Sequence, residues 1–217
     1  MQQRIITVIL LIGIFFGLTM LVYGMMDWRL PDRETGYSPE QPLDYSHRLH
    51  AGELQIDCQF CHTAANQSRY AGIPSSDVCM KCHGIVTSSF DVLQQEQELA
   101  DKEQRKPQPI ISDELRKLYD SLALDQELKP KDDATATSIP WNRVHNLPDF
   151  VYFNHSAHVN SGVTCQRCHG PVESMERVRQ VEDLSMGWCV NCHREVNKTG
   201  VNGHPVHAST DCAVCHY

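Results

Sequence analysis

The chain repeats the motif Cys-x-x-Cys-His five times, and no other feature limits its possible folds as strongly. The motifs begin at residues 58, 79, 165, 189 and 212, and are called motif 1 to motif 5 in this order. Two thiols at this spacing can each form a thioether with one vinyl group of a haem, and the histidine that follows can ligate the iron. The sequence therefore predicts five covalently bound c-type haems, held by Cys58, Cys61, His62, Cys79, Cys82, His83, Cys165, Cys168, His169, Cys189, Cys192, His193, Cys212, Cys215 and His216.

Cysteine pairs at this spacing also bind structural zinc, carry the redox centre of thioredoxin-like proteins, or form disulfides. None of these uses requires a histidine after the second cysteine. All ten cysteines of the chain belong to the five motifs, so none remains for a separate site. The repeat favours haem attachment, and with it a multihaem cytochrome c.

The chain has few of the large apolar side chains that form a conventional hydrophobic core. Only 7% of the 217 residues are aromatic. Haems have large apolar faces, so we expect them to form much of the core of a mostly α-helical domain with little regular structure. The formal net charge is −8, and the haem propionates add to it, which argues against nucleic acid as a partner.

An apolar segment precedes the motifs. Residues 5–26 carry no charge and follow a polar stub at 1–4; as a helix they would extend about 33 Å, enough to cross a bilayer. A cleaved signal peptide has a shorter apolar core and a small-residue cleavage site, so we expect one retained transmembrane signal anchor. Haem attachment takes place on the oxidising side of the membrane. This predicts a single-pass protein of the bacterial inner membrane with its haem domain in the periplasm.

Residues 27–46 contain three prolines and are expected to form an extended tether. The haem domain at 47–217 then divides in sequence into a two-haem lobe at 47–83, an insert at 84–140 and a three-haem lobe at 141–217. The insert has no cysteine or histidine, and helices are predicted in it near 88–102 and 113–122. It is either a solvated spacer or a docking surface for partner subunits, because its apolar stripes need covering.

A low-spin haem iron needs a second axial ligand, and the chain offers more candidates than five haems require. Three pairs of histidines stand three residues apart, so on a helical turn each pair would share a face, each histidine serving a different haem. Of these, the third pair is the weaker candidate because Gly203 and Pro205 suggest a loop. No haem is forced to have an open site, which weighs against a catalytic multihaem centre. The candidates are His47, His50, His145, His155, His158, His204, His207 and Met186.

Several longer strings resemble a known family. They are Tyr45–His50, Ile56–His62, Cys79–His83, Trp141–His155, Ser185–Cys189 and the terminal Cys215-His-Tyr. Together with the single apolar N-terminal segment, they are similar to the pentahaem cytochrome c subunit of alternative complex III, a bacterial quinol:cytochrome c or quinol:oxidase oxidoreductase. The resemblance covers most of the chain apart from the insert. It implies distal ligation by the first two histidine pairs, with His145 or Met186 as the fifth ligand.

The resemblance also implies partners: an iron–sulfur and molybdopterin-like periplasmic subunit, polytopic membrane subunits that oxidise quinol, and a monohaem cytochrome c or a terminal oxidase. We therefore expect an electron-transfer subunit that relays electrons from quinol oxidation and does not itself catalyse bond chemistry. One alternative is a quinol dehydrogenase-type anchor that feeds a periplasmic reductase. The other is a multihaem oxyanion reductase, which would need a five-coordinate iron.

Overall fold

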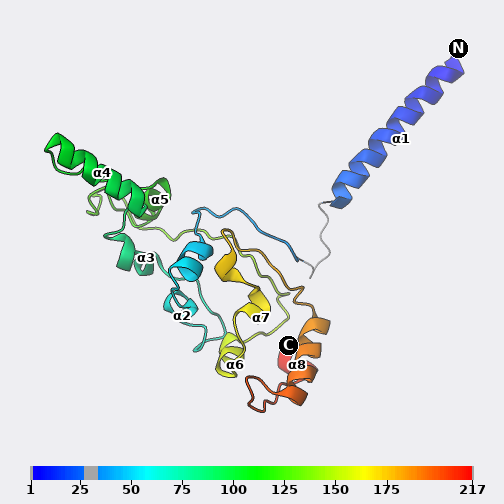
Figure 1. The fold of residues 1–217 in the computed structure, drawn as a ribbon. Helices are drawn as coiled ribbons and strands as arrows, with labels where there is room; N and C mark the ends of the chain where they lie inside the picture. The colour runs from blue at the N-terminus through cyan, green and yellow to red at the C-terminus, as the bar shows by residue number, and fades with distance from the viewer. Residues whose placement is uncertain (1, 27–33, 217) are drawn as a thin grey trace.

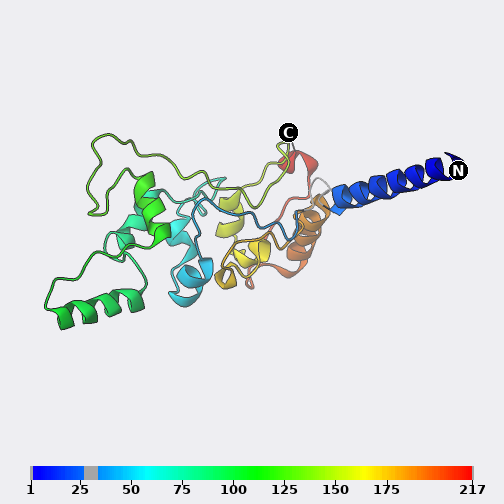
Figure 2. The same ribbon diagram turned by 90° about the horizontal axis from the view of Figure 1, so that it is seen from above.

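The computed structural model describes residues 2–26 and 34–216, and its regular structure there is helical (Figures 1 and 2). Within these residues the chain forms three isolated β-bridges and no strand. The expected fold, mostly helical with little regular structure, is confirmed. The elements are α1 (Gln2–Met26), η1 (Arg48–Glu53), α2 (Cys58–Cys61), α3 (Ser76–His83), α4 (Phe90–Glu103), α5 (Asp113–Ser121), α6 (His155–Asn160), α7 (Gln166–His169), η2 (Val172–Ser174), α8 (Met186–Thr199) and α9 (Cys212–Cys215).

Helix α1 contains the apolar segment, and every side chain described in it is exposed. From Gln3 to Gly24 it is long and apolar enough to cross a membrane. A signal sequence near an N-terminus passes the same test, so the retained anchor stays a prediction. Residues 27–33 of the predicted tether lie outside the described residues.

Each haem motif lies on or beside a short helix, and the residues before the motifs explain why these helices start there. Asp57 caps α2 by accepting a hydrogen bond from the backbone N–H of Gln59 at 2.7 Å. Asp211 caps α9 in the same way, through the N–H of Ala213 at 3.0 Å. A carboxylate at this position satisfies a backbone donor that the helix leaves unpaired. The aspartates therefore fix the start of the turn that carries motifs 1 and 5.

The two predicted helices of the insert are present as α4 and α5, and Ser112 caps α5 by accepting a hydrogen bond from the N–H of Leu115. Leu118 and Tyr119 of α5 are buried, and they pack with Ile111 against Cys79 and Met80 of motif 2. The Tyr119 hydroxyl donates a hydrogen bond to the carbonyl of His83 at 2.6 Å. This half of the insert therefore covers motif 2, in addition to spacing the lobes apart in sequence.

The two lobes are contiguous in space, although the insert separates them in sequence. Helix η1 lies against η2, and the backbone N–H of Arg48 donates to the carbonyl of Met175 at 2.9 Å. Gly52 is so close to the backbone of Glu173 that a Cβ atom there would overlap the Glu173 carbonyl oxygen. The close approach requires glycine at this position, because any other side chain would force the two elements apart.

Candidate haem sites

The histidines of motifs 1, 2 and 4 are oriented by the backbone. The Nδ1 atom of His62 donates to the carbonyl of Gly72 at 2.7 Å, that of His83 to Val86 at 2.8 Å, and that of His193 to Ser209 at 2.5 Å. A histidine that binds a metal through one ring nitrogen usually donates the other N–H to such an acceptor, which fixes its tautomer. These three rings therefore have Nε2 available to ligate an iron.

The first two histidine pairs approach the motif histidines from the other side. The ring centres of His50 and His83 lie 6.1 Å apart, those of His155 and His169 6.4 Å, and those of His158 and His193 6.0 Å. Two imidazoles bound through Nε2 to opposite sides of one metal, with metal–nitrogen bonds of about 2.0 Å, have centres about 6.2 Å apart. All three distances match this spacing, so each of these pairs fits one haem iron.

The pairs at 47/50 and 155/158 have nearly the same geometry, although they are 108 residues apart in the chain. Tyr45 stands edge-on to His47 at 4.8 Å and stacks on His50 at 4.4 Å. Phe153 stands edge-on to His155 at 4.8 Å and stacks on His158 at 4.6 Å. The aromatic residue two positions before each pair thus holds both rings, and prevents them from turning.

Hydrogen bonds complete the same pattern. The Nδ1 atoms of His50 and His158 each donate at 2.8 Å to the carbonyl four residues earlier, of Ser46 and Asn154. The Nδ1 atom of His155 donates to the carbonyl of Arg69 at 2.9 Å. In all three rings Nε2 is left for a metal, as in the motif histidines.

His47 completes the set beside motif 1. Burial, followed by the nearby ring of His62, lowers the pKa of His47 to about 4. Its Nδ1 is buried and has no hydrogen-bond partner among the described residues. A neutral imidazole with an uncommitted ring nitrogen is suited to bind iron. His47 is therefore placed to serve motif 1, while His50, from the same turn, faces motif 2.

His145 has a different position from the one expected of a distal ligand. Its Nε2 lies 3.3 Å from Nδ1 of His169, and the two ring centres are 4.4 Å apart. This separation is too short for an iron between the rings. Burial, and then His145 and His155, lower the pKa of His169 to about 3. The geometry suits a hydrogen bond from His169 to a neutral His145, with Nε2 of His169 directed to the metal.

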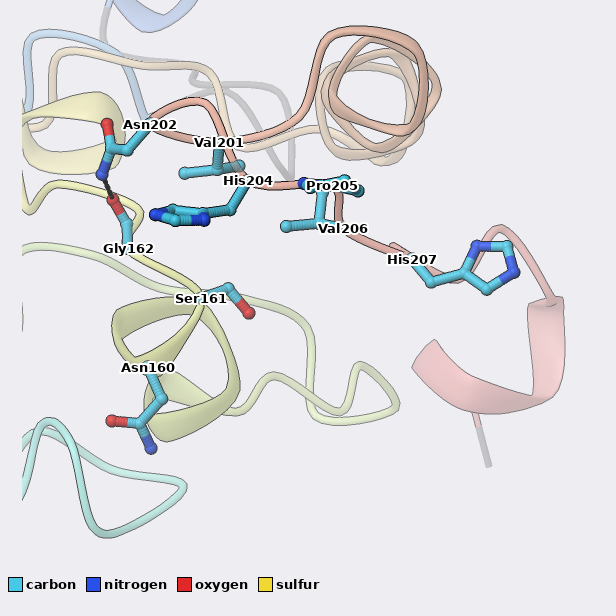
Figure 3. Close-up of a pocket in the computed structure, with 9 residues that line it drawn as sticks. All are labelled: Asn160, Ser161, Gly162, Val201, Asn202, His204, Pro205, Val206 and His207. Atoms are coloured by element: carbon cyan, nitrogen blue, oxygen red, sulfur yellow. Dashed lines mark hydrogen bonds between the residues drawn. The ribbon is translucent and has the colours of Figure 1, made fainter.

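The pair at 204/207 lies in a loop and not on a helix, as its flanking glycine and proline predict. Figure 3 shows the two rings pointing in different directions: His204 towards Gly162, and His207 away from it. Asn202 ties this loop to Gly162 by a hydrogen bond of 2.8 Å. The ring of His216 in motif 5 stacks on Phe150 at 5.8 Å. Met186 is the first residue of α8 and is 70% exposed.

The distribution of buried side chains agrees with the expectation that haems form much of the core. Few hydrophobic side chains are buried in the described residues, and most of them gather in the insert around α5. All ten cysteines are unpaired as thiols. No three His, Cys, Asp or Glu side chains converge on a point between residues 34 and 216, as a structural zinc site would require. The histidines meet instead as opposed pairs.

The residues that accept hydrogen bonds from the Nδ1 atoms of the candidate ligands were not predicted from the sequence. The acceptors at Gly72, Val86 and Ser209 are backbone carbonyls, which any residue type can provide. Two signals were nevertheless readable: an aspartate directly before Cys58 and Cys212, and an aromatic residue two positions before each of the first two histidine pairs.

Comparisons with known proteins agree with this geometry. Residues 151–217 match the family model of cytochrome c7 and related cytochrome c. The chain is 27% identical over 224 residues to the multihaem cytochrome c subunit of a menaquinone reductase from Nitratidesulfovibrio vulgaris (strain Hildenborough), and the match covers 93% of this chain and 88% of that protein. These likenesses bear out the prediction of a multihaem cytochrome c. The narrower identification with alternative complex III remains a prediction.

Proposed function

We propose that this chain is a membrane-anchored pentahaem c-type cytochrome that relays electrons from quinol oxidation to a periplasmic cytochrome c or a terminal oxidase. The observation that carries the proposal is the set of opposed histidine pairs, whose ring centres lie 6.0 to 6.4 Å apart beside three of the motifs. Irons with two histidine ligands exchange single electrons without binding a substrate. The likeness to a quinone-linked subunit supports the same role.

The proposed ligand set follows the pairs. His47 serves motif 1, His50 motif 2, His155 motif 3 and His158 motif 4. For motif 5, His207 is the candidate on the segment that leads into α9, with His204 and Met186 as the other groups near that end of the chain. A bound haem would supply a one-electron ferric/ferrous couple, and these residues would hold it and set its potential.

The cell-level part of the proposal is a single-pass subunit of the inner membrane, with α1 as the retained anchor and the haem domain in the periplasm. Its partners would be quinol-oxidising polytopic membrane subunits, an iron–sulfur and molybdopterin-like periplasmic subunit, and a monohaem cytochrome c or a terminal oxidase. The length of α1, the ten cysteines available for haem attachment and the resemblance to alternative complex III support this assignment.

The relative's name favours a second candidate within the same class: electron flow in the opposite sense, from a periplasmic donor towards menaquinone. In the alternative of an anchor that feeds a periplasmic reductase, electrons flow from the membrane quinol to the periplasm, as in the main proposal. An oxyanion reductase would instead require an iron with an open coordination site. Measured potentials separate the two senses of flow, because electrons move from low to high potential along the haems.

One purification of the intact membrane complex tests the proposal. Denaturing mass spectrometry should give the full-length chain plus five haem masses, and electron paramagnetic resonance should show low-spin ferric haem only. Added quinol should reduce the haems. A mature N-terminus beyond residue 26 would reject the anchor, and fewer than five haems would reject the motif interpretation. A high-spin haem that binds cyanide readily would favour the reductase.

A further inference from the structure

The motifs do not contact each other in chain order. Motif 1 lies next to motif 2, because the ammonium group of Lys81 lies 5.5 Å from the ring centre of Phe60. In the sequence, Lys81 stands between the two cysteines of motif 2, and Phe60 between those of motif 1. His50, which belongs to the turn before motif 1, faces His83 of motif 2. These contacts make motifs 1 and 2 neighbours.

Motif 1 also lies next to motif 3, although more than 100 residues separate them. Burial, and then the neighbouring thiol of Cys165, raise the pKa of the Cys58 thiol, so the two cysteines lie near each other. The loop after motif 1 is bonded to α6, where the N–H groups of His155 and Ser156 donate to the carbonyls of Arg69 and Ser68, both at 3.1 Å. Motif 1 therefore has a neighbour on each side.

Motifs 3, 4 and 5 continue in chain order. The guanidinium of Arg167, in motif 3, lies 4.0 Å from the sulfur of Cys192 in motif 4. Asn197 at the end of α8 exchanges hydrogen bonds of 2.8 and 2.7 Å with Ala208, just before motif 5. In both views α3, α2, α7 and α8 succeed one another across the domain, with α9 beside α8 (Figures 1 and 2).

The place where the segment after the anchor joins the domain can also be identified. After the segment 27–33 the chain re-enters the described structure at Glu34, whose carboxylate accepts a hydrogen bond from Asn146 at 3.1 Å. Two residues on, the N–H of Gly36 donates at 2.7 Å to the carbonyl of Gln180, a buried residue of the segment that leads into α8. The segment after the anchor therefore joins the domain beside motifs 3 and 4: His145, next to Asn146, contacts His169 of motif 3, and Glu182, two residues after Gln180, bonds to Trp188, directly before motif 4. Helix α3 with motif 2 lies away from this junction.

From these contacts we infer that the five motifs form one unbranched row in the order 2-1-3-4-5, with the anchor joined beside motifs 3 and 4 and motif 2 at the end away from this junction. The inference rests on the proposed function, since it adds the path to the proposed haems. The bound haems would supply one-electron couples, so electrons would pass along the row one at a time, and no bond would form or break. A quinol supplies two electrons and releases two protons at its own site in the membrane subunit.

The order predicts different results for two matched variants of the intact complex. Cys79→Ala/Cys82→Ala removes the haem at the end of the row, so a reduced menaquinone analogue should still reduce all four remaining haems. Cys58→Ala/Cys61→Ala removes the haem next to it and isolates motif 2, so only three of the four remaining haems should be reduced at early times. Dithionite should reduce all four in both variants, and absorbance of the reduced haems gives the counts.

Each other outcome overturns part of the inference. The opposite pattern would mean a row in chain order, with motif 1 at the end. Reduction of all four haems in both variants would mean a second route to motif 2. Reduction of a single haem in the motif 1 variant would mean that electrons enter at motif 2.

Failure of the proposed function is distinguishable, because it would appear in the unaltered complex as a haem count other than five or as no reduction by quinol. If either variant fails to assemble, a structure of the haem-loaded complex decides the order. The iron of motif 1 is expected between those of motifs 2 and 3, and any other position would overturn the row.

Discussion

At the residue scale, one turn of chain places its two histidines against two different motif histidines. In the turn at 47–50 and again in α6, two histidines three residues apart share a face, as the spacing predicted. Within α6, His155 faces His169 while His158 faces His193. If these histidines are the distal ligands, each pair would link two haem sites through four residues of backbone, and a change in one ligand would affect its neighbour directly.

The ligand assignment makes a prediction for two matched alanine variants. His158→Ala should convert one of the five low-spin haems to a high-spin form, because it opens one coordination position. His204→Ala should leave all five low-spin, since its ring points to Gly162 and away from the motif helices. Electron paramagnetic resonance of oxidised complexes with full haem content measures both. A high-spin haem in the His204 variant, with none in the His158 variant, would mean that the terminal pair, and not the pair in α6, supplies distal ligands.

His145 is predicted to position His169, not to bind iron. A hydrogen-bond acceptor behind a ligating imidazole raises the basicity of the ligand, and so stabilises ferric iron. His145→Leu should raise the potential of one haem by roughly 60 mV, which corresponds to a tenfold change in preference for one electron, and His145→Gln should restore part of the shift. All five haems should remain low-spin in a redox titration followed by paramagnetic resonance. A new high-spin haem would instead identify His145 as a distal ligand.

At the element scale, local signals predicted the helices well and long-range packing poorly. The insert helices were expected near 88–102 and 113–122, and α4 and α5 differ from these ranges by at most two residues at an end. The cap at Ser112 and the apolar spacing are local, so the sequence alone carries them. The contact of η1 with η2 depends on residues about 120 positions apart, and neither segment has a sequence pattern that predicts contact with the other.

Gly52 tests that contact. Gly52→Ala should destabilise the domain by about 1–3 kcal/mol, because the added methyl group overlaps the backbone of Glu173 and separates η1 from η2. Gly187→Ala is the matched control: its new Cβ would have Ser185 Oγ as its nearest neighbour at 3.8 Å, and alanine favours the helix. Denaturant unfolding followed by circular dichroism compares the two. Equal stability of both variants would mean that the junction tolerates a side chain.

At the scale of the whole molecule, the sequence predicts the number and chemistry of the sites but not their arrangement. Motif spacing identifies each cysteine and proximal histidine without reference to the fold. The row 2-1-3-4-5 arises because the loop at Arg69 bonds to α6, where His155 begins the second histidine pair. A backbone hydrogen bond between distant loops has no residue signature, so the sequence could not predict it.

The distribution of burial predicts that the chain does not fold without haem. Side chains of the described residues form a small cluster around α5, which leaves the motif segments without a core of their own. When the chain is produced without haem attachment, circular dichroism should show little helix beyond α1, and proteolysis should cut readily within 141–217. A protease-resistant fragment covering that range would contradict the prediction.

The hydrogen bonds between Arg69 and His155 have a consequence for assembly. A chain exported from its N-terminus presents motifs 1 and 2 to the haem-attachment machinery long before residue 155 emerges. The junction between motifs 1 and 3 can therefore close only late, after a loop of more than 80 residues has been exported. Until then the first two sites form a separate pair, and a nascent chain halted in the insert would hold haem without conducting.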